Sequence, residues 1–461
     1  MAATDPALWT TTEQAAAIRR GDLGSVELLD AQLARVDRLN PQVNAVCTLA
    51  VEEAHDRARA ADEATAAGQS WGELHGVPIT VKDAIATAGI RSTGGSPKLR
   101  DNVPVHDAQV VAAVKRAGAI VFGKTNVPLW SGDFQTFNEM FGTTNNPWDL
   151  ARVPGGSSGG AAAAVACGMT SFEIGTDIGG SVRVPSAFCG VFGHKPSFGV
   201  IPTLGYLDEP NGGVTESDVN VFGPIARSAE DLAFLLGLLA GPTKDRAAGW
   251  RLELPREGLN DLRSLRVATW FDEASVPMDA EMAAVLHGVA DRLVDGGAAV
   301  DRTIRPELDF TTAWRRGAWL IGAACNVSDG ERDVSHNEWL LTDRERARLR
   351  QRWAEFFEHV DVLLCPITLT PAFPHQQEGT WADRECVVNG VPAPYLSLEA
   401  WPALIGSAYL PSTSTPVGHT SAGLPVGVQV VSPYLHDYRS IEVAGLITDL
   451  VDGYAVPPIA R

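Results

Sequence analysis

The chain has 461 residues, 45% of them hydrophobic, and a formal net charge of −19. This acidic balance argues against a nucleic-acid surface, and no apolar run approaches the roughly 20 residues that a membrane span needs. The N-terminal residues lack the basic and apolar segments of a secretory signal. Neither the six widely spaced cysteines nor the ten histidines show metal-ligand spacing. We therefore expect a cytoplasmic protein without a nucleic-acid, membrane or metal partner.

Three helices are predicted at the start of the chain, over residues 10–21, 25–41 and 52–68. The second of these helices is expected to end at Pro41. Strands are predicted over residues 76–83, 119–125, 171–177, 265–271, 298–304, 360–367 and 423–433, and further helices over 107–118, 159–168, 228–241 and 279–297. Such alternation predicts an α/β fold in which a mixed sheet lies between helical layers. No linker or repeat interrupts it, so we expect a single domain over residues 1–461, with a smaller lobe over about 300–400.

The segment "GVPITVKDA", residues 76–84, alternates apolar and polar side chains. On a strand, Thr80 and Lys82 lie on the face opposite the valines and the isoleucine. A lysine at a strand end usually extends its amine to solvent. A buried lysine with a lowered pKa can instead act as a base, although lowering its pKa by about 3 units costs roughly 4 kcal/mol. Both interpretations remain open from this segment alone.

In "VPGGSSGGAAAAVA", residues 153–166, glycines bracket Ser157 and Ser158 ahead of a helix of small residues. The pattern fits a glycine hinge with a serine N-cap. Gly155-x-Ser157-x-Gly159 also matches the nucleophile elbow of α/β-hydrolases. That elbow must follow a strand, and "NPWDLARVP" with its two prolines is a poor strand. The elbow is therefore the less favoured interpretation.

In "GTDIGGSVRVPSAFCG", residues 175–190, two glycines precede Ser181. Exposed backbone N–H groups before a nucleophile are what an oxyanion hole for acyl transfer requires, but a tight turn explains the glycines equally well. A serine nucleophile needs a base, and no histidine lies in a recognisable triad context. His194 is the nearest, and we interpret it as a loop histidine with satisfied hydrogen bonds. A lysine acting through a second serine would do the same work.

These three segments, in this order, resemble the amidase signature family. Its defining stretch is similar to residues 153–196, where Ser157 lies 24 residues before Ser181. The resemblance extends to residues 125–149 and to two C-terminal stretches, 361–373 and 412–431. It thus covers nearly the whole chain, with a signature core at about 76–240. It implies the fold of that family, a single large α/β domain with a mixed central sheet sandwiched between helices.

The resemblance also implies roles for individual residues. Ser181 would be the nucleophile, Ser157 a bridging serine after a cis peptide bond from Gly156, and Lys82 the base acting through Ser157. The oxyanion would be bound by the backbone N–H groups of Ile178, Gly179, Gly180 and Ser181. Supporting positions around them would be Ser158, Thr176, Asp177 and Arg183, the last either holding the loop or contacting substrate. No metal or organic cofactor is implied.

The function implied is hydrolysis of a C–N bond in a small amide through a serine acyl-enzyme. Aromatic residues between positions 129 and 141 favour an apolar or aryl amide, or an aryl carbamate, as the small-molecule partner of a monomer or homodimer. The candidate pocket residues, each equally explained by core packing, are Trp130, Phe134, Gln135 and Phe137. The same stretch also contains Met140 and Phe141.

Three other functions are alternatives. The first is the amidase-like glutaminase component of a tRNA-dependent amidotransferase, from which this chain departs in "GTDIGGS" and "KPSFGVIPTLG". The second is an α/β-hydrolase-type esterase that uses Ser157 with a downstream aspartate and His419 or His436. A catalytically silent binding protein is the third, and it has no support because all three catalytic positions are intact.

Overall fold

The computed structural model describes residues 5–329, 334–451 and 453–461. Its larger sheet is built from β6 (Glu173–Asp177), β7 (Phe192–Lys195), β8 (Val221–Ala226), β9 (Arg266–Thr269), β10 (Ala299–Asp301), β11 (Val362–Cys365), β14 (Ser412–His419) and β15 (Pro425–Val431). In this part of the chain the strands lie in the order β10-β9-β11-β15-β14-β7-β8-β6. β9 pairs in parallel with both β10 and β11, and the other neighbours are antiparallel. The predicted mixed α/β sheet is thus confirmed.

A smaller sheet carries the lysine segment. It consists of β1 (Val46–Leu49), β3 (Ile120–Thr125) and β2 (Pro78–Lys82), in that order. β2 runs parallel to β3 and lies beside β6 of the larger sheet. Two hairpins stand apart from both sheets, β4 (Phe137–Asn138) with β5 (Gly142–Thr143), and β12 (Glu385–Val388) with β13 (Val391–Pro394).

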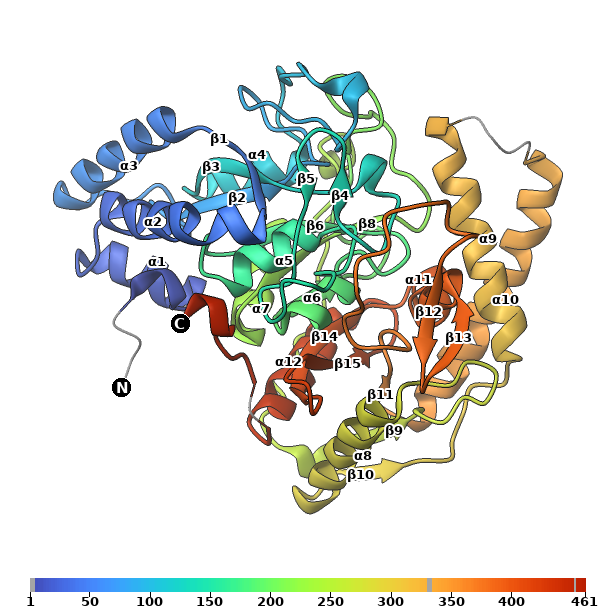
Figure 1. Cartoon of the computed structure of the whole chain (residues 1–461). Coiled ribbons are helices and arrows are strands. Elements are labelled where there is room, and N and C mark those ends of the chain that lie inside the picture. The colour runs from blue at the N-terminus through green and yellow to red at the C-terminus, as the bar shows by residue number, and fades with distance from the viewer. Residues whose placement is uncertain (1–4, 330–333, 452) are drawn as a thin grey trace.

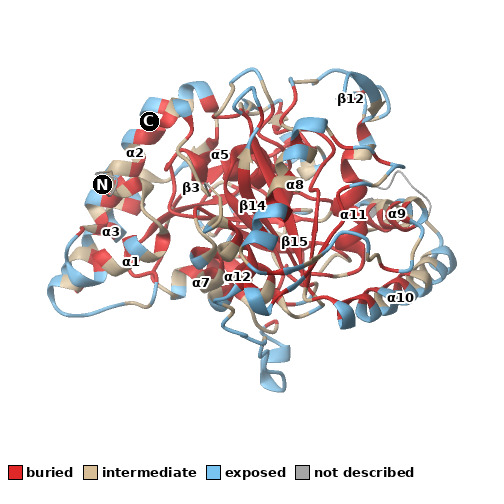
Figure 2. Cartoon of the chain, turned by 90° about the horizontal axis from the view of Figure 1, so that it is seen from below, coloured by how far each residue is buried: buried red, intermediate tan, exposed pale blue. Residues whose placement is uncertain are grey.

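Helices cover both faces of the larger sheet (Figure 1). They are α5 (Gly159–Ala166) and α6 (Arg183–Cys189) on one face, and α7 (Ala229–Leu239), α8 (Ala280–Asp295) and α12 (Asp437–Thr448) on the other. Alternate residues of β15 show the two layers. Val428 and Val430 pack with α8 and α12, whereas Gln429 accepts a hydrogen bond from Arg183 of α6. All of α5 is buried, because its glycines, alanines and single valine allow close packing (Figure 2).

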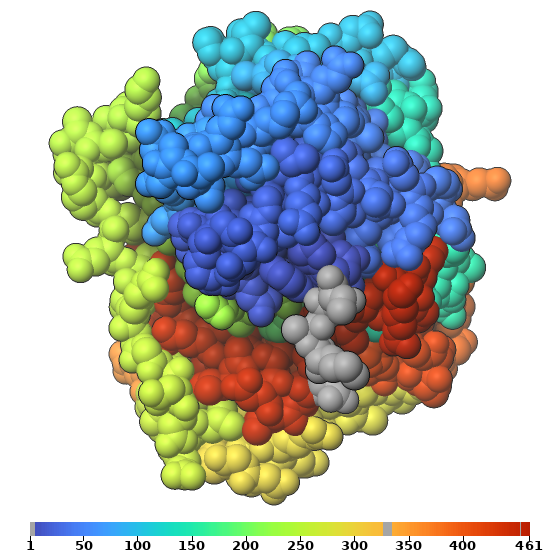
Figure 3. Space-filling view, turned by 90° about the vertical axis from the view of Figure 1, so that its left-hand side faces the viewer, coloured from blue at the N-terminus to red at the C-terminus, as the bar shows by residue number. Residues whose placement is uncertain are grey.

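The N-terminal helices lie beside the C-terminal segment of the chain (Figure 3). They are α1 (Thr11–Arg20), α2 (Ser25–Val43) and α3 (Val51–Ala66). The Arg35 guanidinium of α2 donates to the Ala460 carbonyl across this contact. The prediction that Pro41 ends α2 was wrong, because the helix continues to Val43 and ends at Asn44 in the left-handed conformation. Proline so close to a helix end removes a single hydrogen bond, which the last turn tolerates.

The remaining helices are α4 (Gln109–Arg116), α9 (Phe310–Asp329), α10 (His336–His359) and α11 (Ala400–Ser407). α11 packs against α9, which packs against α10. Two short 3₁₀ helices also matter for the site, η3 (Leu129–Ser131) and η6 (Tyr395–Glu399). None of the described helices is both long and apolar enough to cross a membrane.

Candidate active site

The Lys82 amine lies in a buried cluster of three hydroxyl groups. Lys82 is the last residue of β2, and its side chain is fully buried. Its Nζ donates to Ser157 Oγ at 2.7 Å, Ser158 Oγ at 2.9 Å and Thr176 Oγ1 at 2.7 Å. An ammonium group has three N–H donors, so the charged form satisfies all three contacts. The neutral form has a lone pair that can accept a proton from one of these hydroxyls.

Burial lowers the pKa of Lys82 to about 7, even though the nearby carboxylates of Asp177 and Glu173 raise it. Desolvation disfavours the charged amine, and this effect outweighs the attraction of the two acids. At neutral pH a large share of the molecules therefore hold Lys82 as a neutral amine. That is the protonation state a general base needs.

Ser157 and Ser158 lie at the start of α5, and the Gly156–Ser157 peptide bond is cis. Glycine is required at 156 because an added Cβ would lie 2.3 Å from the Asp133 carbonyl oxygen. The Ser158 N–H donates to the Ser181 carbonyl at 3.1 Å. This hydrogen bond joins the two serine segments, so the structure brings together the lysine and both serines that the sequence singles out.

Ser181 lies in the turn between β6 and α6, at the wall of a cavity of about 710 Å³. Its 8% exposure contrasts with the complete burial of Ser157 and Lys82. The Ser181 hydroxyl can therefore meet a molecule in the cavity, whereas Ser157 and Lys82 are closed off from solvent.

The turn before Ser181 differs from the prediction at Gly180. Its N–H donates to Asp177 Oδ1 at 2.8 Å, so this amide is already engaged within the protein. Among the described residues, the N–H groups of Ile178, Gly179 and Ser181 donate no hydrogen bond. Those three amides remain the candidates for binding an oxyanion.

Arg183 holds this turn from inside the protein. Its fully buried guanidinium donates to Asp177 through Nε at 3.0 Å and through a terminal nitrogen at 2.8 Å. It also donates to the Pro402 carbonyl and to Gln429 Oε1. Burial raises the pKa of Asp177, but the charge and hydrogen bonds of Arg183, together with the Lys195 charge and the Val182 N–H, lower it to about 2. Arg183 therefore supports the loop and does not face the cavity.

The cavity wall differs from the predicted pocket. Phe134 lines it, but Trp130, Gln135 and Phe137 do not. The Trp130 ring packs beside a hydrophobic cluster of the N-terminal half, and the Gln135 amide pairs with the backbone of Gln376. Phe137 instead lies 5.6 Å from the Arg384 guanidinium.

Residues far along the chain complete the cavity. α9 and the segment around the β12–β13 hairpin supply much of the wall, including Trp314, Trp319, Ile321, Trp381 and Glu399. Reasoning from the sequence missed these residues, because no local pattern brings positions 314–399 beside Ser181.

His194 lies within β7 rather than in a loop, which corrects the prediction. Its ring is buried between Thr413 Oγ1, at 3.0 Å from Nδ1, and Asp437 Oδ1, at 3.2 Å from Nε2. Its hydrogen bonds are satisfied, as predicted, and they join β7, β14 and α12. Among the described residues, no three His, Cys, Asp or Glu side chains are grouped to hold a metal ion.

Comparison with known proteins identifies the family of this chain. A family model described as Amidase matches residues 27–328 and 324–441. The chain is 33% identical, over 97% of its length and 98% of the relative's, to a component of the glutamyl-tRNA(Gln) amidotransferase of Roseiflexus sp. (strain RS-1). It resembles the structure of 6-aminohexanoate cyclic dimer hydrolase complexed with substrate, with a TM-score of 0.79 and 27% identity over 99% of this chain and 98% of that one. A bacterial aryl acylamidase, 23% identical, shares the fold with a TM-score of 0.82 over 96% of both chains. The chain therefore belongs to the amidase signature family, whose enzymes act on the C–N bonds of amides.

Proposed function

We propose that this protein is a serine amidase that cleaves a small amide through an acyl-enzyme. In this proposal Ser181 is the nucleophile, Ser157 relays protons and Lys82 is the base. The observation that carries it is the 2.7 Å contact between Lys82 Nζ and Ser157 Oγ, behind a serine that lines a cavity.

In the first half of the reaction, neutral Lys82 takes the proton of Ser157 while Ser157 takes the proton of Ser181. Ser181 Oγ forms a bond to the amide carbon, and the carbonyl electron pair moves onto oxygen. The N–H groups of Ile178 and Gly179, with that of Ser181, bind this oxyanion. Removing one such donor from other enzymes costs roughly 3–4 kcal/mol of transition-state stabilisation.

In the second half, the proton held by Lys82 returns through Ser157 to the leaving nitrogen, and the C–N bond breaks. Water then attacks the acyl-enzyme by the same relay and releases the acid. Ser158 and Thr176 contribute by holding Nζ at a fixed position beside Ser157. In this proposal the relay between the reacting atoms and the base consists of two groups of this chain, Ser157 and Lys82.

The cavity favours substrates with an apolar or aryl part. Phe134, Trp314 and Trp381 contribute aromatic rings to its wall, and Ile321 adds an aliphatic side chain. Aromatic rings offer a large apolar contact area at a low entropic cost. Aryl amides, alkyl amides and aryl carbamates are the substrate classes that we propose, hydrolysed by the chain without a partner protein.

A second candidate is the glutaminase component of an amidotransferase. The relatives from glutamyl-tRNA(Gln) amidotransferases share about a third of their residues with this chain over nearly the whole length of both proteins. The sequence similarity to these relatives supports the second candidate. The aryl acylamidase is only 23% identical to this chain, so it supports a shared fold but gives no support to the first candidate's substrate.

One experiment separates the two candidates. Purified chain is incubated with 4-nitroanilides and, separately, with glutamine, and the release of nitroaniline or ammonia is measured. Release of nitroaniline by the chain alone, abolished in Ser181→Ala, supports the amidase proposal. Ammonia release from glutamine only, and only with the other amidotransferase components added, would support the second candidate and contradict the first.

A further inference from the structure

Glu399 places a buried carboxyl group in the cavity wall. It is the last residue of η6, only 5% exposed, and it lines the same cavity as Ser181. Its Oε1 lies against Gly179, where an added Cβ would be 2.5 Å away. This carboxyl does not cap α11, and no hydrogen bond to it is formed among the described residues. Burial raises the pKa of Glu399 to about 8, and the opposing effect of Arg183 is smaller.

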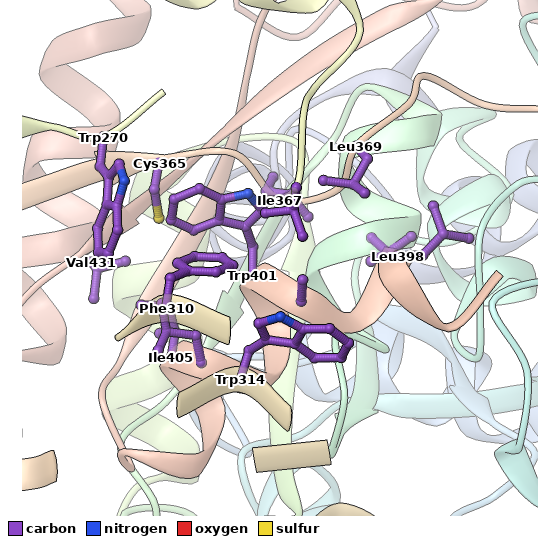
Figure 4. Close-up of a cluster of buried hydrophobic side chains, with 14 of the residues drawn as sticks. Trp270, Phe310, Trp314, Cys365, Ile367, Leu369, Leu398, Trp401, Ile405 and Val431 are labelled. Atoms are coloured by element: carbon purple, nitrogen blue, oxygen red, sulfur yellow. The ribbon is translucent and has the colours of Figure 1, made fainter. Parts of the chain in front are cut away.

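The backbone around Glu399 is fixed by an aromatic cluster (Figure 4). Trp401, two residues further on, packs its ring 5.3 Å from Trp270 and 4.8 Å from Phe310. Leu398, the preceding residue, is buried in the same cluster. The segment that carries Glu399 is therefore held on both sides, which keeps the carboxyl at the cavity wall.

The other charged groups near the cavity already have partners or lie at its rim. Asp133 accepts hydrogen bonds from Arg384 and from the Tyr395 hydroxyl. Arg183 donates to Asp177, so its guanidinium is not available to Glu399. Arg315 is exposed and lies 5.7 Å from the Trp314 ring.

An ionised Glu399 alone would be unfavourable in two ways. Its charge is buried with no donor among the described residues, which costs free energy. It also lies beside Gly179, whose N–H is a candidate donor to the oxyanion, so a second negative charge would form nearby. A cation brought by the substrate would remove both costs. The aromatic rings of Trp314 and Phe134 suit the same ligand, because ring faces attract cations.

We propose that Glu399 selects substrates that carry a protonated amine, by accepting a charge-assisted hydrogen bond from the ammonium group. This inference rests on the proposed function and specifies its substrate class, which becomes amino-substituted amides with an apolar or aryl remainder. The bound ammonium group also favours the ionised form of Glu399. The carboxylate–ammonium pair therefore forms when the substrate binds.

Two matched substrate pairs test this. L-Alanine 4-nitroanilide is compared with isobutyryl 4-nitroanilide, in which a methyl group replaces the ammonium. For a longer spacing, 4-aminobutyryl 4-nitroanilide is compared with pentanoyl 4-nitroanilide. At pH 7.5 the wild type should prefer the amine in at least one pair by about tenfold or more in kcat/KM, the size expected for a charge-assisted hydrogen bond. Equal kcat/KM within both pairs would overturn the proposal.

Glu399→Gln retains the size of the side chain and removes its charge. It should abolish the preference, mainly by raising KM for the amine, and increase kcat/KM for the neutral partner. Glu385→Gln, which changes an exposed carboxylate on β12, should retain the wild-type preference. A preference that survives unchanged in Glu399→Gln would contradict the proposal.

A binding measurement keeps the inference separate from the proposed function. By calorimetry, benzylammonium should bind to the wild type and to Ser181→Ala at least tenfold more tightly than benzyl alcohol does. This measurement needs neither turnover nor a folded Glu399 variant. Absence of anilide hydrolysis together with selective ammonium binding would contradict the proposed amidase activity and leave the ammonium site standing. Equal binding of the amine and the alcohol would overturn the site.

Discussion

Lys82 Nζ and Ser157 Oγ lie 2.7 Å apart inside the protein, although 75 positions separate the two residues in the chain. Neither side chain is exposed to solvent. The contact exists because β2 lies beside β6 and because α5, built from small residues, packs closely enough to bring its first turn against the end of β2. The fold thus places an amine, whose pKa burial has lowered, next to a hydroxyl.

The first prediction concerns pH. The pKa of Lys82 is lowered to about 7, and the active base is the neutral amine. Raising the pH through 7 removes the proton, so kcat/KM should rise about tenfold between pH 5 and 6 and level off above pH 8. Lys82→Ala should lower kcat/KM by about 10² to 10⁴. The exposed Lys98→Ala should match the wild type. A Lys82→Ala variant with full activity and an unchanged pH profile would exclude the base role.

A second prediction identifies the nucleophile. A fluorophosphonate probe should label Ser181, because Ser181 lines the cavity while Ser157 is fully buried behind it. The adduct is mapped by mass spectrometry of proteolytic peptides. Ser397→Ala, which removes another hydroxyl in the cavity wall, should be labelled like the wild type. An adduct on Ser157 would instead favour the α/β-hydrolase interpretation.

The relay itself is tested by Ser157→Ala. Turnover should fall by about 10² to 10⁴, the range for loss of a positioned proton-transfer group. Circular dichroism should show an unchanged fold, since the hydroxyl adds little to packing. Wild-type turnover in this variant would remove Ser157 from the mechanism.

The sequence predicted the chemical groups of the site better than its walls. Lys82, Ser157 and Ser181 lie in short motifs with fixed spacing, so local sequence was enough to single them out. Trp314 and Glu399 come from distant segments, and only the tertiary fold brings them to the cavity. The hydrogen bond from the Gly180 N–H to Asp177 could have been predicted, because an aspartate shortly before a turn often accepts a hydrogen bond from a turn N–H.

The fold was predictable where apolar runs are long enough to be recognised. β2, β3, β6 and β15 all lie within predicted strands. β8 was missed because most of it lies within a glycine- and proline-rich stretch, which is typical of a connection, and its pairing with β6 and β7 stabilises it. Tertiary contacts thus override the local signal for this strand.

A fourth prediction concerns the buried pair of Asp177 and Arg183. Arg183→Met should lower the free energy of unfolding by about 3–5 kcal/mol, because Asp177 is then buried without its charged partner. The pKa of Asp177 is lowered to about 2 in the folded protein. The pair therefore contributes stability that is present above the unfolded pKa, near 3.8, and is lost as the pH falls through 2.

Urea unfolding of both proteins between pH 2.5 and 7 measures this difference. The gap in stability between wild type and Arg183→Met should be largest at pH 5–7 and shrink toward pH 2.5. The exposed Arg302→Met serves as a control for loss of an arginine, since its partner Asp291 is also exposed. A gap that is the same at every pH would show that the ion pair is not its source.

The last prediction tests the close packing behind Ser157. A Cβ at position 156 would lie 2.3 Å from the Asp133 carbonyl oxygen and 2.7 Å from that of Gln135. Gly156→Ala must therefore displace backbone, and we expect a loss of stability of more than about 2 kcal/mol together with a large fall in kcat. Gly288→Ala is the matched control, because Gly288 lies in α8 and an added Cβ would meet no described atom within 4 Å apart from the adjoining backbone of its own helix. There alanine should stabilise the helix by up to about 1 kcal/mol and leave kcat unchanged. Equal melting temperatures and kcat values for the two variants would show that the 133–135 loop does not constrain Ser157.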